Sequence, residues 1–518
     1  MLRLTNQEAY LSRSSLLSLC ALAGLLAACS GQQSAYTPTS PMSDATTGAA
    51  AAQAPAQSAT NTSTAAAPGQ SQAVTSAANA SSVVPMATTS VPQHIATWAK
   101  DFYWGAGANG SSAQVRQYLT YAQGGLGDAK ASNDCTGSNG CSSIFYFDPN
   151  FFYDESACGS AESTQILKNA NESWYVHLTG YSDSAHRAQG SYTMTCGGKT
   201  VTIPVYAMNS LSTSMQSYYT SYFHTNAAAF NYFMMDDTSA KVLSQFYGPG
   251  GGFCWNVSPN HWCSATQEMP TDASVVAEHV ALGKALTHPN GTPMQGFFNG
   301  INFSGTTVNG LSILSSAGSP YVGAWCEDCV VNSGTFRPTM YANVLNAMAQ
   351  IDKIPNSRFV ELNHGESAIG SAAQIAQREI TTAIAWLGYS EGHTVVYPDL
   401  EANTNNLAVF PENSIYPTGP LQTMNAGATD IQVAPGVYRR EFSACYNAGV
   451  AIGPCASIVN ANSSTVVVKS AWLSQTYGHL VVMSGGDIPA GGKVNLTSTP
   501  FVANSTTLGG AQGMLIVR

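Results

Sequence analysis

Residues 232–236 read Tyr-Phe-Met-Met-Asp, and residues 321–327 read Tyr-Val-Gly-Ala-Trp-Cys-Glu. Both are short apolar and aromatic runs that end in a carboxylate, as expected of buried parallel strands that deliver a polar side chain to one edge of a sheet. Six further short runs occur along the chain, and most also end in a polar residue: 102–104, 144–148, 174–177, 296–299, 358–363 and 394–399. Together they predict eight strands.

Helical periodicity separates several of these runs. The apolar faces are Val115, Tyr118, Leu119 and Ala122; Val275, Val276, Val280 and Leu286 after a Thr271-Asp272 cap; Val344, Leu345, Met348 and Ile351; and Ile380, Ile384 and Leu387. An inserted hairpin is expected over 192–206, around Gly197-Gly198, and a further helix over 214–228. Eight β-then-α units predict an α/β fold, a (β/α)8 TIM-type barrel over residues 95–418. The rival, a doubly wound sheet, would show a phosphate-binding glycine motif, which Gly105-Ala106-Gly107-Ala108 matches poorly.

After about residue 420 the helical periodicity stops. Short β-rich segments separated by turn residues follow, and they predict a small C-terminal β-sandwich over residues 419–518. The segments are 429–433, 437–442, 450–452, 465–468, 479–483 and 494–497.

The N-terminus carries an export signal. Arg3 and Arg13 flank a polar start, an apolar run covers 16–26, and Leu26-Ala27-Ala28-Cys29 resembles the bacterial lipobox. The run is too short to span a bilayer, which takes about 20 apolar residues, so residues 1–28 are expected to be a lipoprotein signal peptide and Cys29 the lipidated residue. We expect residues 29–94, rich in Ala, Ser, Thr, Gln and Pro, to be a disordered tether. The resemblance to bacterial lipoproteins implies that Ser30 disfavours retention in the inner membrane, so we expect the outer membrane, on its periplasmic or surface face.

Charge and cysteine content agree with export. The 19 basic and 29 acidic residues give a net charge of −10, which excludes the basic footprint of a nucleic-acid-binding protein. Of the twelve cysteines, ten remain after Cys20 and Cys29 are set aside, and an even number outside the cytosol indicates disulfides. Sequence proximity favours Cys135–Cys141, Cys254–Cys263, Cys445–Cys455 and Cys158–Cys196, which leaves Cys326 and Cys329.

Catalytic groups of a barrel lie at the C-terminal ends of its strands. Carboxylates on facing strands, among Trp, Tyr, Asn and His, suit glycoside hydrolysis, which needs one carboxylic acid and a second carboxylate. Asp236 and Glu327 are the catalytic candidates. Binding candidates at strand ends are Trp104, Asp148, His177, Asp237, Asn299, Trp325, Glu361, Asn363 and Tyr397. We expect no metal and no cofactor.

The chain resembles a bacterial glycoside-hydrolase-like (β/α)8 barrel family with a C-terminal β-sandwich. The resemblance rests on the acidic residues ending strand four and lying near strand six, and on the later segments 437–442, 449–452 and 459–460, with Cys445 to Cys455 inserted around the turn. It implies that Asp236 is the nucleophile or stabilising carboxylate and Glu327 the general acid/base. Strand register decides between Glu327 and Asp328, and Glu361 is the other candidate acid. Asp237 also suits a helix cap.

Three alternatives stay open. The fold is equally compatible with a non-catalytic glycan-binding lipoprotein. Trp325-Cys326-Glu327-Asp328-Cys329 resembles the thioredoxin motif, but no helix start follows it, so a structural disulfide is favoured. Gly388-Tyr389-Ser390-Glu391-Gly392 matches the esterase nucleophile pattern, but it follows a helix and precedes a strand, the reverse of the required order.

Overall fold

The computed structural model describes the following residues: 96–99, 124–126, 142–177, 181–226, 230, 232–236, 238, 272–332, 334–367, 370–390, 393–401, 412, 415–447, 449–483 and 497–518. The expected signal peptide, Cys29 and tether lie outside these ranges. So do Trp104, Asp237 and the four cysteines Cys135, Cys141, Cys254 and Cys263.

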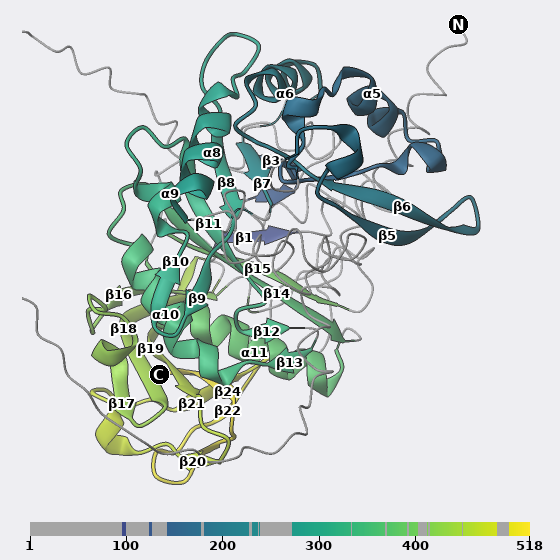
Figure 1. Cartoon of the computed structure of the whole chain (residues 1–518). Helices are drawn as coiled ribbons and strands as arrows, with labels where there is room; N and C mark the ends of the chain where they lie inside the picture. Colours follow the sequence, from purple (N-terminus) through teal and green to yellow (C-terminus); the bar gives the residue numbers. More distant parts are fainter. Residues whose placement is uncertain are drawn as a thin grey trace, which may run out of the picture.

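Eight parallel strands form the centre of the molecule (Figure 1). Their pairings close into a barrel in the order β1-β15-β14-β11-β8-β7-β3-β2. The strands are β1 (Ala96–Ala99), β2 (Gly124–Leu126), β3 (Ser142–Phe147), β7 (Tyr232–Met235), β8 (Gln295–Asn299), β11 (Tyr321–Glu327), β14 (Arg358–Ser367) and β15 (Thr394–Glu401). The predicted α/β class with a parallel sheet is confirmed.

Helices pack around this sheet in the described part of the chain. They are α6 (Thr213–Asn226), α8 (Asp272–Ala285), α9 (Leu311–Ser315), α10 (Tyr341–Ile351) and α11 (Ala372–Leu387). The predicted apolar face of α11 is buried, with Ile380, Ile384 and Leu387 at 0% exposure, and each such side chain contributes about 1.5–3 kcal/mol. Ser371 caps α11 by accepting a hydrogen bond from the Gln374 amide at 3.2 Å. None of the described helices is long and apolar enough to cross a bilayer.

Side chains of the sheet alternate between two faces. Phe233, Met235, Phe298, Ala324 and Phe359 lie in the same apolar cluster as the helix residues, so they face outward. The residues between them therefore face the barrel interior. Register pairs these interior residues across the strands: Met234 with Phe297, Asn299 with Trp325, and Trp325 with Val360.

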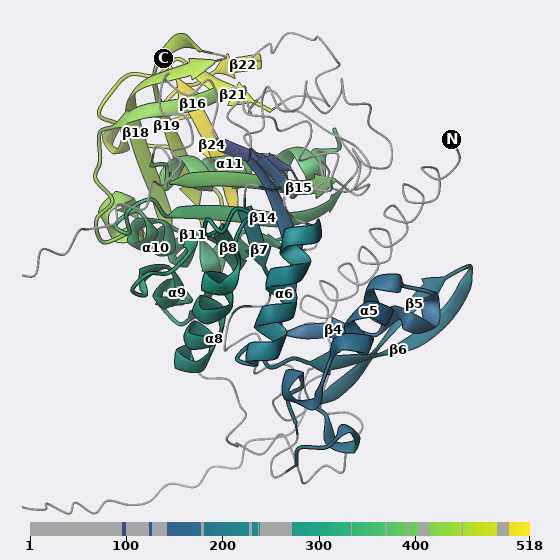
Figure 2. The same ribbon diagram turned by 90° about the horizontal axis from the view of Figure 1, so that it is seen from above.

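An inserted region follows β3 and projects away from the barrel (Figure 2). It contains β4 (Phe151–Tyr153), α5 (Ala161–Asn169), and the antiparallel pair β5 (Gln189–Cys196) and β6 (Lys199–Ala207). The predicted hairpin is confirmed, and Gly197 and Gly198 make its turn with φ values of 58° and 77°, which favour glycine. The Cys158–Cys196 disulfide ties this hairpin to the segment before α5.

One of the predicted barrel strands differs from the structure, and another falls outside the described residues. The segment 174–177 is not a barrel strand: Glu172–Trp174 is a 3₁₀ helix, and Tyr175 and His177 form isolated bridges. Trp174 is buried in a separate cluster with Met208 and Met215, so its apolar pattern reflects the insertion. The segment 102–104 lies outside the described residues, and β1 and β2 take the first two places in the sheet.

The C-terminal region is β-rich, as predicted. Its main sheet runs β16-β18-β19-β24-β21-β22, with β17 (Gln432–Ala434) beside β18. The strands are β16 (Ile415–Pro420), β18 (Val437–Asn447), β19 (Val450–Asn460), β21 (His479–Val482), β22 (Thr497–Pro500) and β24 (Gln512–Val517). This sheet starts at Ile415, ahead of the expected boundary at 419. The Cys445–Cys455 disulfide joins β18 and β19.

The C-terminal sheet packs on α11, on the side of the barrel opposite the insertion (Figures 1 and 2). Ser457 donates a hydrogen bond to the Ala383 carbonyl at 2.7 Å. Arg440, 6% exposed, donates from Nη1 to the carbonyls of Leu387 and Tyr389, both at 2.9 Å. Leu387 is the last residue of α11, so its carbonyl lacks a partner within the helix, and Tyr389 lies just beyond the helix end.

Candidate active site

Three neighbouring strands end in polar residues that meet at one edge of the sheet. Asp236 follows β7, Asn299 ends β8 and Glu327 ends β11. Each continues the interior-facing alternation of its strand, after Met234, Phe297 and Trp325. The carboxyl ends of adjacent parallel strands lie side by side, so these side chains converge at the barrel mouth.

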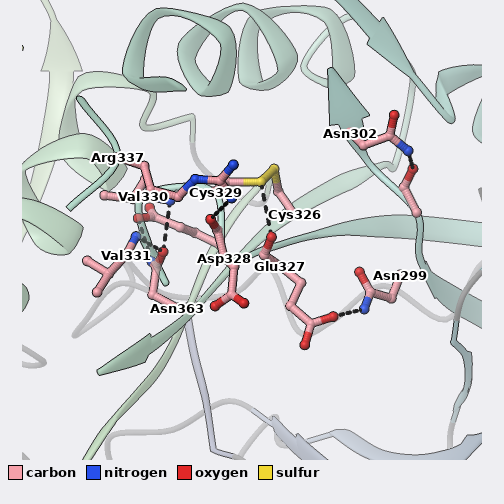
Figure 3. The surroundings of a disulfide bond; sticks show 12 residues. Asn299, Asn302, Cys326, Glu327, Asp328, Cys329, Val330, Val331, Arg337 and Asn363 are labelled. Carbon is pink, nitrogen blue, oxygen red and sulfur yellow. Dashed lines mark hydrogen bonds between the residues drawn. A yellow bond between two sulfur atoms is a disulfide. The ribbon is translucent and has the colours of Figure 1, made fainter. Parts of the chain in front are cut away.

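The Asn299 amide connects the two carboxylates. Its Nδ2 donates to Asp236 Oδ1 at 2.9 Å and also to Glu327 Oε2, a contact visible in Figure 3. A side-chain amide nitrogen carries two hydrogens, so it can serve both acceptors at once. Asn299 and Asp236 are 9% and 5% exposed, so both bonds lie largely out of water, where they are strong.

The backbone of Asp236 is fixed from the neighbouring strand. Its amide donates to the Phe147 carbonyl at 3.1 Å, and its carbonyl accepts from Asn150 Nδ2 at 3.1 Å. Asn150 Oδ1 in turn lies 3.1 Å from His279 Nε2 on α8. Sequence reasoning missed Asn150; its only signal was the turn-forming Asp148-Pro149-Asn150 that ends β3.

Asp148 lies beside Asp236, at the end of β3. Its Oδ1 accepts from the amides of Asn150 and Phe151, at 2.8 and 3.2 Å. Burial, and then the charge of Asp236, raise the pKa of Asp148 well above its usual range, because two nearby carboxylates resist ionising together. The charged form of Asp148 is therefore disfavoured beside Asp236.

A disulfide closes the loop that follows Glu327. Cys326 and Cys329 are bonded, and Asp328 between them adopts a left-handed φ of 55°. Arg337 Nη1 donates to the Asp328 carbonyl at 2.7 Å (Figure 3). The two sulfur-bearing residues are 0% and 4% exposed, which fits the structural disulfide favoured from the sequence.

Glu361 and Asn363 do not join Asp236 and Glu327. Glu361 and Asn363 lie two and four residues after Phe359 on β14, so their side chains point to the same face as Phe359. Glu361 is also paired in register with Cys326. Both side chains therefore lie on the helix-facing side of the sheet. Both are 0% exposed. The expectation that Glu361 and Asn363 bind substrate is therefore wrong, because it assumed the opposite strand parity.

Other expected site residues also lie elsewhere. Trp325 faces the barrel interior but is 1% exposed, so it is core and offers no open surface for stacking. His177 lies in the insertion, 3.1 Å from Glu172 Oε2, and not at a barrel strand end. Tyr397 belongs to β15, opposite Leu362 in register, and its side chain lies outside the described structure. In the described ranges, no three His, Cys, Asp or Glu side chains form a group that could hold a metal ion.

Gly388 ends α11 and β15 begins at Thr394. The G-x-S-x-G stretch therefore connects a helix to a strand, as predicted, and not a strand to a helix. No esterase nucleophile arrangement follows from it.

Comparison with known proteins adds a weak structural similarity. No family model matches the chain, and no curated protein matches it. Among solved structures, the chain is similar to a pullulanase from Anoxybacillus sp. LM18-11 complexed with maltotetraose (9% identity, TM-score 0.41, 83% of this chain and 72% of that one). It is also similar to a family 39 glycoside hydrolase from Bacteroides cellulosilyticus WH2 (7% identity, TM-score 0.40, 82% and 81%).

A further similar structure is the type I pullulanase from Bacillus subtilis str. 168 complexed with maltose, at 9% identity and a TM-score of 0.36. The matched part of this chain, 75% of it, spans 55% of that enzyme's length. Identities and TM-scores at this level do not transfer an activity, so the assignment below rests on the site itself.

Proposed function

We propose that the chain is a glycoside hydrolase with a (β/α)8 barrel, which cleaves a polysaccharide with Asp236 as nucleophile and Glu327 as general acid/base. The observation that supports this proposal most strongly is that the Asn299 amide nitrogen donates hydrogen bonds to both carboxylates. Strands β7 and β11 thus present two acidic groups within reach of one glycosidic bond.

The shared donor also limits the separation of the two carboxylates. Each N–H···O bond spans about 2.7–3.2 Å, so the two acceptor oxygens lie at most about 6 Å apart. Retaining glycosidases hold their carboxyl groups roughly 5–5.5 Å apart, and inverting enzymes roughly 6.5–9.5 Å. The geometry supports a retaining mechanism.

In that mechanism Glu327 gives a proton to the glycosidic oxygen while Asp236 attacks the anomeric carbon. The leaving sugar departs with that proton, and a glycosyl ester forms on Asp236. Glu327 then takes a proton from water, which attacks the same carbon and releases Asp236 as a carboxylate. The raised pKa of Asp148 disfavours a second negative charge beside Asp236, whose carboxylate is the form that a nucleophile requires.

We also propose that Cys29 is lipidated and that residues 29–94 tether the enzyme to the outer membrane. The lipobox-like sequence and the nearly uncharged spacer support this. An acyl anchor with a long flexible spacer would let a soluble barrel reach an insoluble polymer.

The test compares full-length, detergent-solubilised protein with Asp236→Asn and Glu327→Gln on a panel of bacterial and plant polysaccharides, with new reducing ends as the readout. We expect release by the wild type and a loss of at least a thousandfold in each variant. Asp183→Asn is the matched control, since Asp183 is an exposed carboxylate in the insertion. Release that survives in both variants would refute the catalytic assignment. Glycan retention without release would favour the glycan-binding alternative.

A further inference from the structure

The loop behind Glu327 is anchored from the helix-facing side of the sheet. The amides of Val330 and Val331 both donate to Asn363 Oδ1, at 3.1 and 2.8 Å. Asn363 Nδ2 donates to Glu361 Oε1 at 2.9 Å. All four residues are 0% exposed, so no water competes for these bonds. Figure 3 shows Asn363 reaching the loop.

Glu361 is a carboxyl group that is fully buried on the helix-facing side of the sheet. Its Oε1 is used by Asn363, whereas its Oε2 has no hydrogen-bond partner in the described structure. Burial raises the pKa of Glu361 to about 8, partly offset by the Asn363 bond. Glu361 in turn adds to burial in raising the pKa of Tyr341 on α10, and the Tyr341 hydroxyl donates to the Ala511 carbonyl at 3.3 Å. At neutral pH Glu361 is therefore a neutral acid.

The anchored residues Val330 and Val331 follow closely after Glu327 in the sequence. Only Asp328 and Cys329 lie between Glu327 and Val330, and the Cys326–Cys329 bond closes that short segment into a ring. Arg337 holds the Asp328 carbonyl from a second direction. A displacement of the Val330 and Val331 amides must consequently move Glu327.

We propose that the buried Glu361–Asn363 pair positions Glu327. The pair binds the Val330 and Val331 amides from the helix-facing side of the sheet, and this contact keeps the general acid/base opposite Asp236. This inference rests on the proposed glycosidase function. It gives Glu361 and Asn363 a role in the reaction without contact with the substrate. Asn363 supplies the acceptor for the loop, and Glu361 fixes the orientation of the Asn363 amide.

Two variants of Glu361 separate positioning from direct catalysis. Glu361→Gln keeps an oxygen acceptor for Asn363 and cannot ionise, whereas Glu361→Leu removes the acceptor at similar volume. At pH 6.5 we expect the Gln variant to keep kcat within about twofold. The Leu variant should lose on the order of tenfold to a hundredfold, the scale for a catalytic group displaced by about 1 Å. KM should stay unchanged, because Asp236 and Asn299 remain in place.

A pH profile gives a second readout. Above pH 8 the wild-type Glu361 ionises, which puts an uncompensated charge in the core and loosens the loop. Above pH 8, Glu361→Gln should therefore keep a larger share of its kcat than the wild type. This comparison stands even if the Leu variant fails to fold. Glu379→Gln and Glu379→Leu on α11 are matched controls, since the pKa of Glu379 is also raised by burial, to about 7, and the charged groups that act on Glu379 are Arg378 and Glu412.

Hydrogen–deuterium exchange of the peptide covering 326–337 reports the loop without any substrate. Exchange should rise in Glu361→Leu and not in Glu361→Gln or the Glu379 controls. A wild type that releases no sugar, with exchange behaving as expected, would end the glycosidase proposal but leave the anchoring intact. Loss of activity in Glu361→Gln at every pH would overturn positioning, because the Gln side chain keeps the acceptor for Asn363. Unchanged exchange and kcat in Glu361→Leu would overturn it as well.

Discussion

Asp148 and Asp236 lie at the ends of adjacent parallel strands, and the charge of Asp236 adds to burial in raising the pKa of Asp148. Ionising Asp148 therefore costs more in the folded protein than in the unfolded chain. The penalty is absent below the ordinary Asp pKa of about 4. It grows as pH rises toward the raised value.

Asp148→Asn should remove this penalty while keeping an oxygen for the amides of Asn150 and Phe151. We expect the Tm of the variant, relative to wild type, to increase steadily between pH 4 and pH 8. Thermal unfolding at several pH values measures it. Asp183→Asn is the control with the opposite sign, because His186 lowers the pKa of Asp183. A Tm difference that does not change with pH would count against a protonated Asp148.

Asn299→Ala removes the amide that both carboxylates share. We expect kcat to fall on the order of a hundredfold, the scale for loss of one preorganised donor. The buried Asp236 carboxylate also loses a donor, so the free energy of unfolding should drop by about 1–3 kcal/mol. Initial rates and urea denaturation measure the two effects. Asn302→Ala, three residues along the chain, is the control. Equal losses of kcat and stability in both variants would contradict a specific role for the Asn299 amide.

The three disulfides in the described part of the chain should differ in their effect on stability. Chain-entropy arguments make a closed loop of about 39 residues worth about 4 kcal/mol, and loops of about 11 and 4 residues about 3 and 2 kcal/mol. Double serine variants of Cys158–Cys196, Cys445–Cys455 and Cys326–Cys329 should follow that order in urea denaturation. The activity order should be reversed, because the Cys326–Cys329 bond adjoins Glu327. Full activity in that last variant would contradict the role of the ring.

Arg440→Met should weaken the contact between the C-terminal sheet and α11. The guanidinium serves the carbonyls of Leu387, Tyr389 and Gln422, and charged donors of this kind contribute on the order of 1.5–3 kcal/mol each. We expect a loss of several kcal/mol in urea denaturation. Lys469→Met, at an exposed position, should change little. Equal stability of the two variants would show that the contact is dispensable.

Cys29→Ser tests the proposed anchor. The variant should take up no radiolabelled palmitate and should move from the detergent phase to the aqueous phase in a Triton X-114 partition. Cys20→Ser, inside the expected signal peptide, is the matched control and should leave labelling intact. Label retained by Cys29→Ser would place the lipid on another residue.

Much of the barrel could be predicted because its strands are strongly apolar and end in polar residues. Strands β3, β7, β8, β11, β14 and β15 overlap the predicted segments. Strand β2 was missed because Gly-Gly-Leu carries almost no β signal. The segment 174–177 was predicted as a barrel strand because Trp174 and Tyr175 are apolar and buried, but they are buried in the insertion. An apolar pattern indicates burial and does not identify the core in which a residue is buried.

The candidate site was also predictable only in part. The carboxylates Asp236 and Glu327 could be found from strand ends alone. Glu361 and Asn363 were placed on the wrong face because the alternation along a strand has period two, and a shift of one residue reverses every side chain. Only the register of Cys326 with Glu361 resolves that ambiguity.

The position of β24 has a consequence for biogenesis. This strand, Gln512–Val517, lies between β19 and β21 and packs against α11, yet it is synthesised after both of these neighbours. Until it arrives, β19 and β21 present open edges, which are templates for aggregation. A chain interrupted shortly before residue 512 would therefore be left with a gap in the middle of a sheet, and proteolysis of such fragments would be the cell's expected response.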